Sequence, residues 1–221
     1  MELIDVIDKK ECTGCMACKN ACPRNVIEIQ EDSKTGFLYP KINKEHCINC
    51  GICKNVCPVK NKLKDNTEDI IVYSCKNKND KIRMQSSSGG IFTLISNYIL
   101  SQNGVVFGAS FDENFEVIHE YTENEEGLAK FRGSKYLQSK IGTSFKKVKE
   151  FLEEGRKVLF TGTPCQVEGL LSFLKKDYEN LYTQDIICHG VPSPKVWRKY
   201  LEYKKSKLSK TKQENISILL F

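Results

Sequence analysis

The sequence lacks the features that send a chain into or across a membrane. Its first residues carry neither the basic start nor the apolar core of a secretory signal, and no apolar run reaches membrane-spanning length. We therefore expect a cytoplasmic protein. With 221 residues, 40% of them hydrophobic, the chain can hold one small and one medium-sized domain, which excludes a large enzyme core.

Histidine is scarce, with three residues, and the sequence contains no nucleic-acid-binding motif. His46 and His119 have no neighbours at metal-ligand spacing, so we expect neither to bind a metal. His189 lies in a loop bounded by glycine and proline, and it is the one histidine that stays a candidate for function.

The net charge is modest, at +6, and much of it lies near the C-terminus. The basic residues there are Lys195, Arg198, Lys199, Lys204, Lys205, Lys207, Lys210 and Lys212. Few aromatic residues separate them, so we interpret the run as a solvated helix face or tail. Docking to an acidic redox partner is the alternative. We expect a partner protein or another subunit, and neither nucleic acid nor a membrane span.

Cysteine, in contrast, is abundant, with eleven residues. Eight of them form two runs of identical spacing, Cys12-x-x-Cys15-x-x-Cys18-x-x-x-Cys22-Pro23 and Cys47-x-x-Cys50-x-x-Cys53-x-x-x-Cys57-Pro58, offset by 35 residues. This internal repeat is typical of a bacterial ferredoxin domain with two [4Fe–4S] clusters, which transfers single electrons. In that pattern three thiolates of a run surround one cluster, and the cysteine before proline ligates the other.

We therefore assign two crossed ligand sets. They are Cys12, Cys15, Cys18 and Cys57 for one cluster, and Cys47, Cys50, Cys53 and Cys22 for the other. Structural zinc is the main alternative, but it gives no reason for a crossed Cys-Pro pair. A disulfide framework is the other, and clustered thiols in a reducing cytoplasm argue against it. Gly14, Ala17 and Gly51 let backbone N–H groups approach cluster sulfurs.

The predicted fold is an α+β ferredoxin-like two-cluster domain followed by an α/β domain with a mixed sheet. Residues 1–60 form the cluster domain, with short strands at 26–29 and 37–40, and the polar residues 61–69 form a linker. In residues 70–221, apolar runs and periodicity predict alternating strands and helices. The predicted strands are 70–74, 105–111, 117–121, 158–160 and 181–187, and the predicted helices are 91–100, 141–152, one ending near 174, and one from Pro194 past Tyr200.

Three loops of the second domain contain residues that cradle anions. Loops 86–90 and 162–166 precede predicted helices, where free N–H groups and the helix dipole favour a phosphate. Loop 132–136 combines a flexible turn with a hydroxyl and two cations. The candidate cofactor-binding residues are Ser87, Ser88, Gly89, Gly90, Gly133, Ser134, Lys135, Gly162, Thr163 and Cys165. Each loop alone has an ordinary alternative, an N-cap or a surface turn, but together they favour a phosphate-bearing cofactor.

Three cysteines lie outside the two runs. Cys165 lies at a predicted helix start, where the helix dipole favours the thiolate. It is a candidate ligand of a further cluster, a redox-active thiol or a small packed residue, and Cys188 has the same alternatives. Cys75, at the end of a predicted strand, is interpreted as buried packing.

Four ordered motifs span the second domain. They are Ser87-Ser88-Gly89-Gly90, Phe131-Arg132-Gly133-Ser134-Lys135-Tyr136, Phe160-Thr161-Gly162-Thr163-Pro164-Cys165-Gln166 and Cys188-His189-Gly190-Val191-Pro192-Ser193-Pro194. With the cysteine runs, the chain resembles the coenzyme F420 hydrogenase/dehydrogenase beta-subunit family, in its bacterial branch with an N-terminal two-[4Fe–4S] ferredoxin domain. Family members run longer, so the apolar end at 216–221 leads us to expect a fragment or early-terminated product that lacks the C-terminal part.

The resemblance implies an oxidoreductase subunit that passes electrons between the two clusters and a flavin, FAD, seated between the three loops. From there electrons go to or from coenzyme F420, another hydride-accepting coenzyme or an organic acceptor. Lys135 would stabilise phosphate or reduced flavin, and no catalytic acid or base is assignable. The alternative function is a ferredoxin-like electron carrier without its own substrate.

Overall fold

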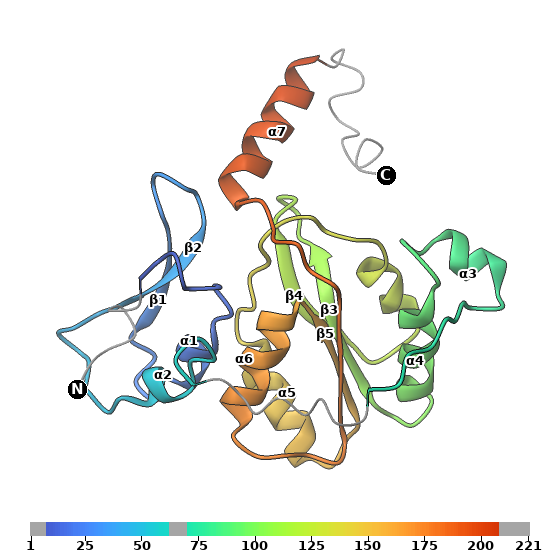
Figure 1. The fold of residues 1–221 in the computed structure, drawn as a ribbon, viewed down its shortest axis with the longest axis horizontal. Coiled ribbons are helices and arrows are strands. Elements are labelled where there is room, and N and C mark those ends of the chain that lie inside the picture. The colour runs from blue at the N-terminus through green and yellow to red at the C-terminus, as the bar shows by residue number, and fades with distance from the viewer. Residues whose placement is uncertain (1–7, 62–69, 208–221) are drawn as a thin grey trace.

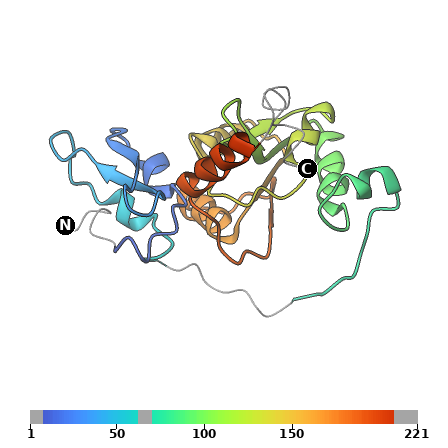
Figure 2. The same cartoon turned by 90° about the horizontal axis from the view of Figure 1, so that it is seen from above.

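The computed structural model describes residues 8–61 and 70–207, which form two lobes packed side by side (Figures 1 and 2). Residues 8–61 make a small lobe that carries the eight motif cysteines, and residues 70–207 make a larger lobe built on a β-sheet. The predicted linker falls almost wholly outside the described residues, as does the apolar run at 216–221. Within the described ranges, no helix is long and apolar enough to span a membrane.

The small lobe consists of two short helices and a two-stranded sheet. The elements are α1 (Ala17–Ala21), β1 (Ile27–Glu31), β2 (Leu38–Ile42) and α2 (Ile52–Asn55). Strands β1 and β2 pair antiparallel with Ile27 opposite Ile42, which confirms the two predicted strands. The Asp32 carboxylate accepts the N–H groups of Lys34 and Thr35 and so closes the turn between them.

The repeat in the sequence is also a repeat in the backbone. Met16 and Gly51 stand at the same place in their cysteine runs, and each is a left-handed residue that precedes a helix, with φ of 64° and 73°. Gly14 and Asn49 are likewise equivalent, with φ of 69° and 51°. Left-handed residues within such loops turn successive N–H groups inward to form an anion-binding concavity. Both runs are therefore shaped to surround a negatively charged group.

The large lobe is an α/β structure, as predicted. Its elements are α3 (Asp80–Met84), α4 (Ile91–Leu100), β3 (Val105–Phe111), β4 (Val117–Thr122), the 3₁₀ helix η2 (Glu126–Phe131), α5 (Ser144–Glu153), β5 (Val158–Gly162), α6 (Pro164–Leu174), β6 (Leu181–Asp185) and α7 (Pro194–Lys207). The strand order is β4-β3-β5-β6, with β4 antiparallel and the other three parallel. The predicted mixed sheet is thus confirmed, and the predicted strands at 105–111 and 117–121 form a hairpin.

Alternate residues of the central strands face opposite sides of the sheet. Phe107 and Phe160 pack on the side of α5 and α6, whereas Val106 and Leu159 pack on the side of α4 and η2. The face covered by α5 and α6 is the one turned toward the small lobe (Figure 1).

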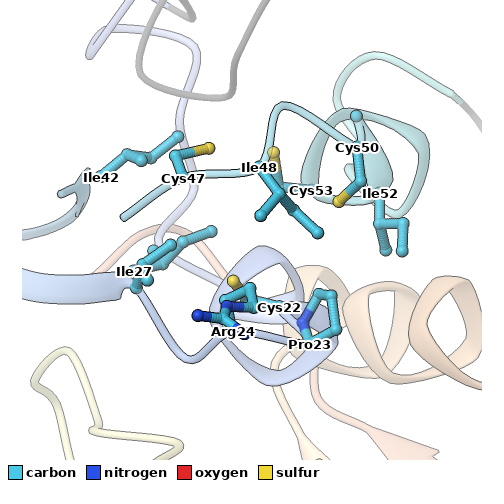
Figure 3. Close-up of a pocket in the computed structure, with 12 residues that line it drawn as sticks. Cys22, Pro23, Arg24, Ile27, Ile42, Cys47, Ile48, Cys50, Ile52 and Cys53 are labelled. Carbon is cyan, nitrogen blue, oxygen red and sulfur yellow. The ribbon is translucent and has the colours of Figure 1, made fainter. Parts of the chain in front are cut away.

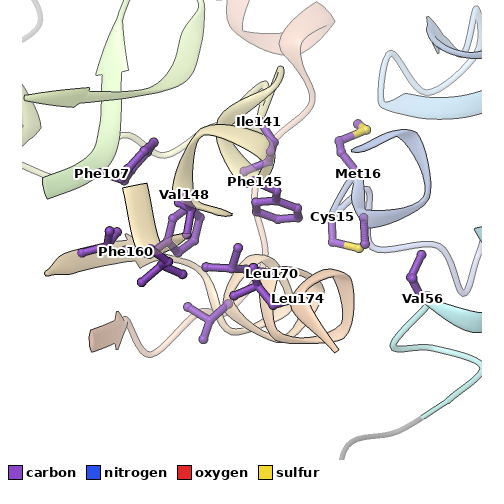
Figure 4. Close-up of a cluster of buried hydrophobic side chains, with 14 of the residues drawn as sticks. Cys15, Met16, Val56, Phe107, Ile141, Phe145, Val148, Phe160, Leu170 and Leu174 are labelled. Atoms are coloured by element: carbon purple, nitrogen blue, oxygen red, sulfur yellow. The ribbon is translucent and has the colours of Figure 1, made fainter. Parts of the chain in front are cut away.

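The two lobes share one hydrophobic core. Cys15 and Met16 of the small lobe belong to the same buried cluster as Phe145, Leu170 and Leu174 of the large lobe (Figure 4). The Asn20 side chain adds a hydrogen bond of 3.2 Å from its Nδ2 to the Gly142 carbonyl oxygen. Because each fully buried side chain of this size contributes about 1.5–3 kcal/mol, the lobes stabilise one another.

The predicted strand at 70–74 is wrong. This stretch has no strand partner among the described residues, and its side chains are exposed, with Val72 88% accessible. Cys75 is exposed too, so its interpretation as buried packing is also wrong. β-Branched residues favour a strand only where a neighbouring strand offers hydrogen bonds and packing. For the same reason β6 ends at Asp185, and Ile186 and Ile187 are exposed beyond it.

Candidate iron–sulfur centres and an adjoining cleft

Four cysteines from both runs surround one hollow in the small lobe. Cys47, Cys50 and Cys53 come from the second run, and Cys22 comes from the first (Figure 3). Apolar side chains complete the wall, among them Pro23, Ile27, Ile42, Ile48 and Ile52. This is the second of the two predicted ligand sets, gathered around a single space.

The other four cysteines, Cys12, Cys15, Cys18 and Cys57, form the first cysteine group, which lies against the large lobe, and the set around the hollow is the second group. Burial is the main cause that raises the pKa of Cys15 to about 12, and the thiols of Cys165, Cys57 and Cys12 add to the effect. Burial also raises the pKa of Cys12, with Cys57 adding to the effect, and it raises the pKa of Cys18 well above its usual range. Cys57 of the second run therefore lies among the thiols of the first run.

Both groups contain the four thiols that a [4Fe–4S] cluster needs. In such a cluster each thiolate binds a different iron, and the ligands stand around a cage. Buried thiols ionise only beside positive charge, which the iron of a cluster would supply.

The third predicted loop lies beside the first cysteine group. The Cys165 thiol raises the pKa of both Cys12 and Cys15, after burial and other larger causes. One turn further along α6, a Cβ atom added at Gly169 would lie 3.0 Å from the Cys15 Cβ atom. Thr163 caps α6 with a reciprocal bond to Gln166, which fixes this loop at the carboxyl end of β5.

A cleft of about 350 Å³ opens at the carboxyl end of the neighbouring strand β3. Its lining residues are Ser87, Phe111, Arg132, Gly133, Ser134, Lys135, Tyr136, Leu137, Trp197 and Tyr200. The first and second predicted loops meet in it, since the Ser134 backbone N–H donates to the Ser87 hydroxyl over 2.9 Å. This volume is at the lower end of the range for small-molecule sites, and in open α/β sheets such sites lie beyond the carboxyl ends of strands.

The structure brings four of the ten predicted cofactor residues into this cleft, namely Ser87, Gly133, Ser134 and Lys135. Ser88, Gly89, Gly90, Gly162, Thr163 and Cys165 do not line it. Gly89 and Gly90 serve packing instead. A Cβ atom at Gly89 would lie 2.8 Å from the Cys75 carbonyl oxygen, and Gly90 is the left-handed N-cap of α4.

The cleft carries positive charge. Among the described residues that line it none is acidic, while Arg132 and Lys135 are both cations. The Lys135 Nζ atom donates to the carbonyl oxygens of Lys130 and Arg132 over 2.7 and 2.8 Å. Burial lowers the pKa of Lys135 to about 8, so the ammonium form still prevails at neutral pH. The cleft therefore suits an anionic group.

One short segment separates the cleft from the first cysteine group. Leu137 lines the cleft, and the next residue, Gln138, is buried against the small lobe. Its side chain accepts from the Leu38 N–H over 2.8 Å and donates to the Leu38 carbonyl oxygen over 3.2 Å. A side chain at Gly14, which lies between Cys12 and Cys15, would collide with the Gln138 amide. The cleft and the first group thus lie one layer of side chains apart.

A buried network holds this segment to the third loop. Gln166 Nε2 donates to the Ser139 hydroxyl over 2.7 Å, and that hydroxyl lies 3.0 Å from His119 Nδ1. His119 Nε2 lies 3.0 Å from the Thr161 carbonyl oxygen, which can only accept. The ring is therefore neutral with its proton on Nε2, and burial lowers its pKa to about 4.

The sequence interpretation missed the aromatic wall of the cleft. Phe111 ends β3, whereas Trp197 and Tyr200 lie one turn apart on α7, far away in the chain. The only signal was weak: a single tryptophan three residues after the proline that opens a helix. Its position against β3 depends on the fold.

Comparisons with known proteins agree with the cysteine pattern and the motifs. A family model for a 4Fe-4S dicluster domain matches residues 11–61, and one for the C terminus of the coenzyme F420 hydrogenase/dehydrogenase beta subunit matches residues 155–218. Over residues 155–218 the chain is thus similar to the coenzyme F420 hydrogenase/dehydrogenase beta-subunit family. The predicted resemblance is confirmed, and the dicluster match supports two [4Fe–4S] clusters in an electron-transfer protein.

Two individual proteins are similar to this chain. It is 27% identical over 193 residues to a coenzyme F420-dependent sulfite reductase from Methanocaldococcus jannaschii, an alignment that covers 86% of this chain and 30% of that protein. The chain therefore spans less than a third of this relative's length. One chain of the F420-reducing [NiFe] hydrogenase complex from Methanosarcina barkeri aligns with a TM-score of 0.48 and 21% identity, covering 60% of this chain and 49% of that one.

Proposed function

We propose that this protein is an iron–sulfur flavoprotein subunit of an oxidoreductase. In this proposal the crossed cysteine sets hold two [4Fe–4S] clusters, and the cleft beside the first set holds a flavin, FAD. The observation that carries the proposal is the single layer formed by Leu137 and Gln138 between the first cysteine group and the cleft. Two redox groups so placed can exchange electrons without a moving part.

Different residues of the cleft would bind different parts of the cofactor. The hydroxyls of Ser87 and Ser134 and the cations of Arg132 and Lys135 bind the phosphate groups. Gly133, at φ 78° with no atom within 4 Å of an added Cβ, lets the backbone approach. A flavin supplies exchange of single electrons with clusters and of electron pairs with a hydride carrier. The protein sets position, charge and exclusion of water.

The final acceptor and the partner are part of the same proposal. The name of the sulfite reductase relative refers to coenzyme F420, so F420 or another hydride-accepting coenzyme is the acceptor class we propose. The exposed second group is where a redox partner protein or another subunit would exchange electrons, because Cys50 is accessible from outside.

The test is anaerobic preparation of the whole protein, followed by iron and flavin quantification and FAD titration by equilibrium dialysis. We expect about eight irons and one FAD per chain, as two four-iron clusters and one cleft require. Lys135→Met should weaken FAD binding about tenfold, a loss of roughly 1.4 kcal/mol for one charge-assisted contact. The control is Lys130→Met, whose ammonium pairs with Glu120 outside the cleft.

If the protein held both clusters but bound no FAD, the proposed flavin site would be wrong. The alternative function, an electron carrier without its own substrate, would then remain. If Lys135→Met bound FAD as tightly as Lys130→Met, Lys135 would not bind the phosphate groups of FAD.

A further inference from the structure

A row of three aromatic rings forms one wall of the cleft. The rings of Phe111 and Trp197 are 5.8 Å apart between centroids and inclined by 20°, and those of Trp197 and Tyr200 are 5.6 Å apart and inclined by 24°. Both pairs are therefore offset stacks, the geometry in which the ring quadrupoles attract. All three residues line the same cleft as the cationic loops.

Hydrogen bonds and an ion pair within the protein hold the aromatic row in position without a ligand. Trp197 Nε1 donates to the Phe115 carbonyl oxygen over 2.6 Å, which ties α7 to the turn between β3 and β4. Next to it, Arg198 makes a bidentate pair with Glu31 of the small lobe, at 2.7 and 2.6 Å. Lys195 Nζ donates to the Ser33 carbonyl oxygen over 2.5 Å. A ring on a helix that is held to both lobes loses little freedom when a ligand stacks on it.

The lining residues of the cleft are therefore of two chemical kinds. Ser87, Ser134, Arg132 and Lys135 supply groups that suit phosphate, and Phe111, Trp197 and Tyr200 supply stacked aromatic carbon. We infer that the row Phe111–Trp197–Tyr200 is the platform for the isoalloxazine ring of the flavin, with Trp197 as its central positioning residue. This orientation rests on the proposed function, and it adds which end of the cofactor lies where.

The single tryptophan of the chain makes the inference measurable, because tryptophan emission then reports Trp197 alone. The probes are FAD, flavin mononucleotide and ADP, each titrated into the anaerobic protein with its clusters in place. Both flavins should quench the emission with saturation, since both carry the isoalloxazine ring. ADP, which has the phosphates and adenine of FAD without that ring, should leave the emission unchanged.

Variants give a second readout through the dissociation constant. Trp197→Leu should weaken FAD binding at least tenfold, since stacking of a heterocycle on an aromatic side chain contributes roughly 1–3 kcal/mol. Trp197→Phe keeps a stacking ring and should stay within about threefold of the unaltered protein. The matched control is Tyr203→Leu, which removes an exposed aromatic ring from the same helix but outside the cleft.

The outcomes separate the two proposals. Quenching by ADP but not by flavin mononucleotide would place adenine on the row and overturn this orientation. FAD binding that is unchanged in Trp197→Leu would do the same while the flavin site itself stands. If neither flavin binds to protein with full clusters, the proposed flavin site and this inference both fall.

Discussion

The two halves of the cysteine repeat have the same spacing and equivalent backbone turns, yet they face different surroundings. Cys15 and Cys50 are equivalent positions, but Cys15 is buried in the core shared by the lobes whereas Cys50 is exposed. Helix α6 covers the first group through Gly169, whereas the residues that line the hollow of the second group all belong to the small lobe and are mostly apolar. One motif thus yields an inner group beside the cleft and an outer group near solvent.

This difference in surroundings should give the two clusters different reduction potentials. Potentials of iron–sulfur clusters depend on solvent exposure and on hydrogen bonds to their sulfurs, so the two clusters should differ although their ligands are alike. In the proposed function, the outer cluster would exchange electrons with a partner, and the inner one would exchange electrons with the cofactor in the cleft. Substitutions that affect one group and spare the other test this comparison.

The largest expected effect comes from exchanging a crossed ligand. Cys57→Ser should damage the inner cluster, held also by Cys12, Cys15 and Cys18, because Cys57 lies among those thiols. Iron content should fall by up to half, and electron paramagnetic resonance of the reduced protein should lose the coupling between two clusters.

The matched variant is Cys22→Ser, which should damage the outer cluster, since Cys22 lines the hollow of Cys47, Cys50 and Cys53. If Cys57→Ser instead spared the inner cluster and harmed the outer one, the crossed assignment would be wrong.

A smaller effect should follow from crowding the inner cluster alone. Gly169→Val places new methyl groups where a Cβ atom already lies 3.0 Å from the Cys15 Cβ atom and 3.1 Å from its Sγ atom. Overpacking of this kind costs about 1–3 kcal/mol of unfolding free energy. A redox titration should show a shifted potential for one cluster and an unchanged potential for the other.

The control for this crowding is Glu168→Val, the neighbouring position on α6, which is only half-buried. Equal shifts of both cluster potentials in Gly169→Val would show that the two groups do not differ in their contact with the large lobe.

The smallest effect concerns pH, through the network that holds the loop beside the inner group. The folded-state pKa of His119, about 4, lies below its ordinary value of 6.5. Between these values the unfolded chain binds more protons than the folded chain, so the unfolding free energy rises with pH. The stabilisation that comes from the lowered pKa of His119 is fully present only well above pH 6.5. The unfolding free energy should therefore fall by about 1 kcal/mol between pH 7.5 and pH 6.

The measurement is the urea midpoint of anaerobic protein across that pH range. His119→Gln has no titratable group at this position and should lose that part of the slope. An unchanged slope would mean that His119 is not buried in the neutral state.

Much of the fold could be predicted from local signals. The hairpin turn carries Asp112, whose carboxylate accepts from the N–H groups of Asn114 and Glu116, and such turns are encoded within a few residues. Helix α5 ends at Glu153, close to the predicted end at 152, and Gly155 follows it at φ 78°, a conformation that glycine favours after a helix. The strand predicted at 70–74 failed because its composition favours a strand but the structure offers it no neighbour.

The candidate site was predictable in its ligand types but not in its boundaries. Cysteine spacing encodes the two ligand groups, because the local backbone brings each run together. The cleft instead depends on three segments that meet only after folding, represented by Ser87, Ser134 and Trp197. Gly89 and Gly162 were predicted to bind a cofactor but do not line the cleft, because a glycine needed for packing and one needed for a ligand look the same in a sequence.

The presence of Cys15 and Met16 in the core between the lobes has a consequence for biogenesis. A predicted cluster ligand, Cys15, is also part of the core against which α5 and α6 pack. Folding of the chain and insertion of its iron and sulfide should therefore be coupled. In a cell short of iron, the larger lobe of the newly made chain should therefore also be incompletely packed and open to proteases.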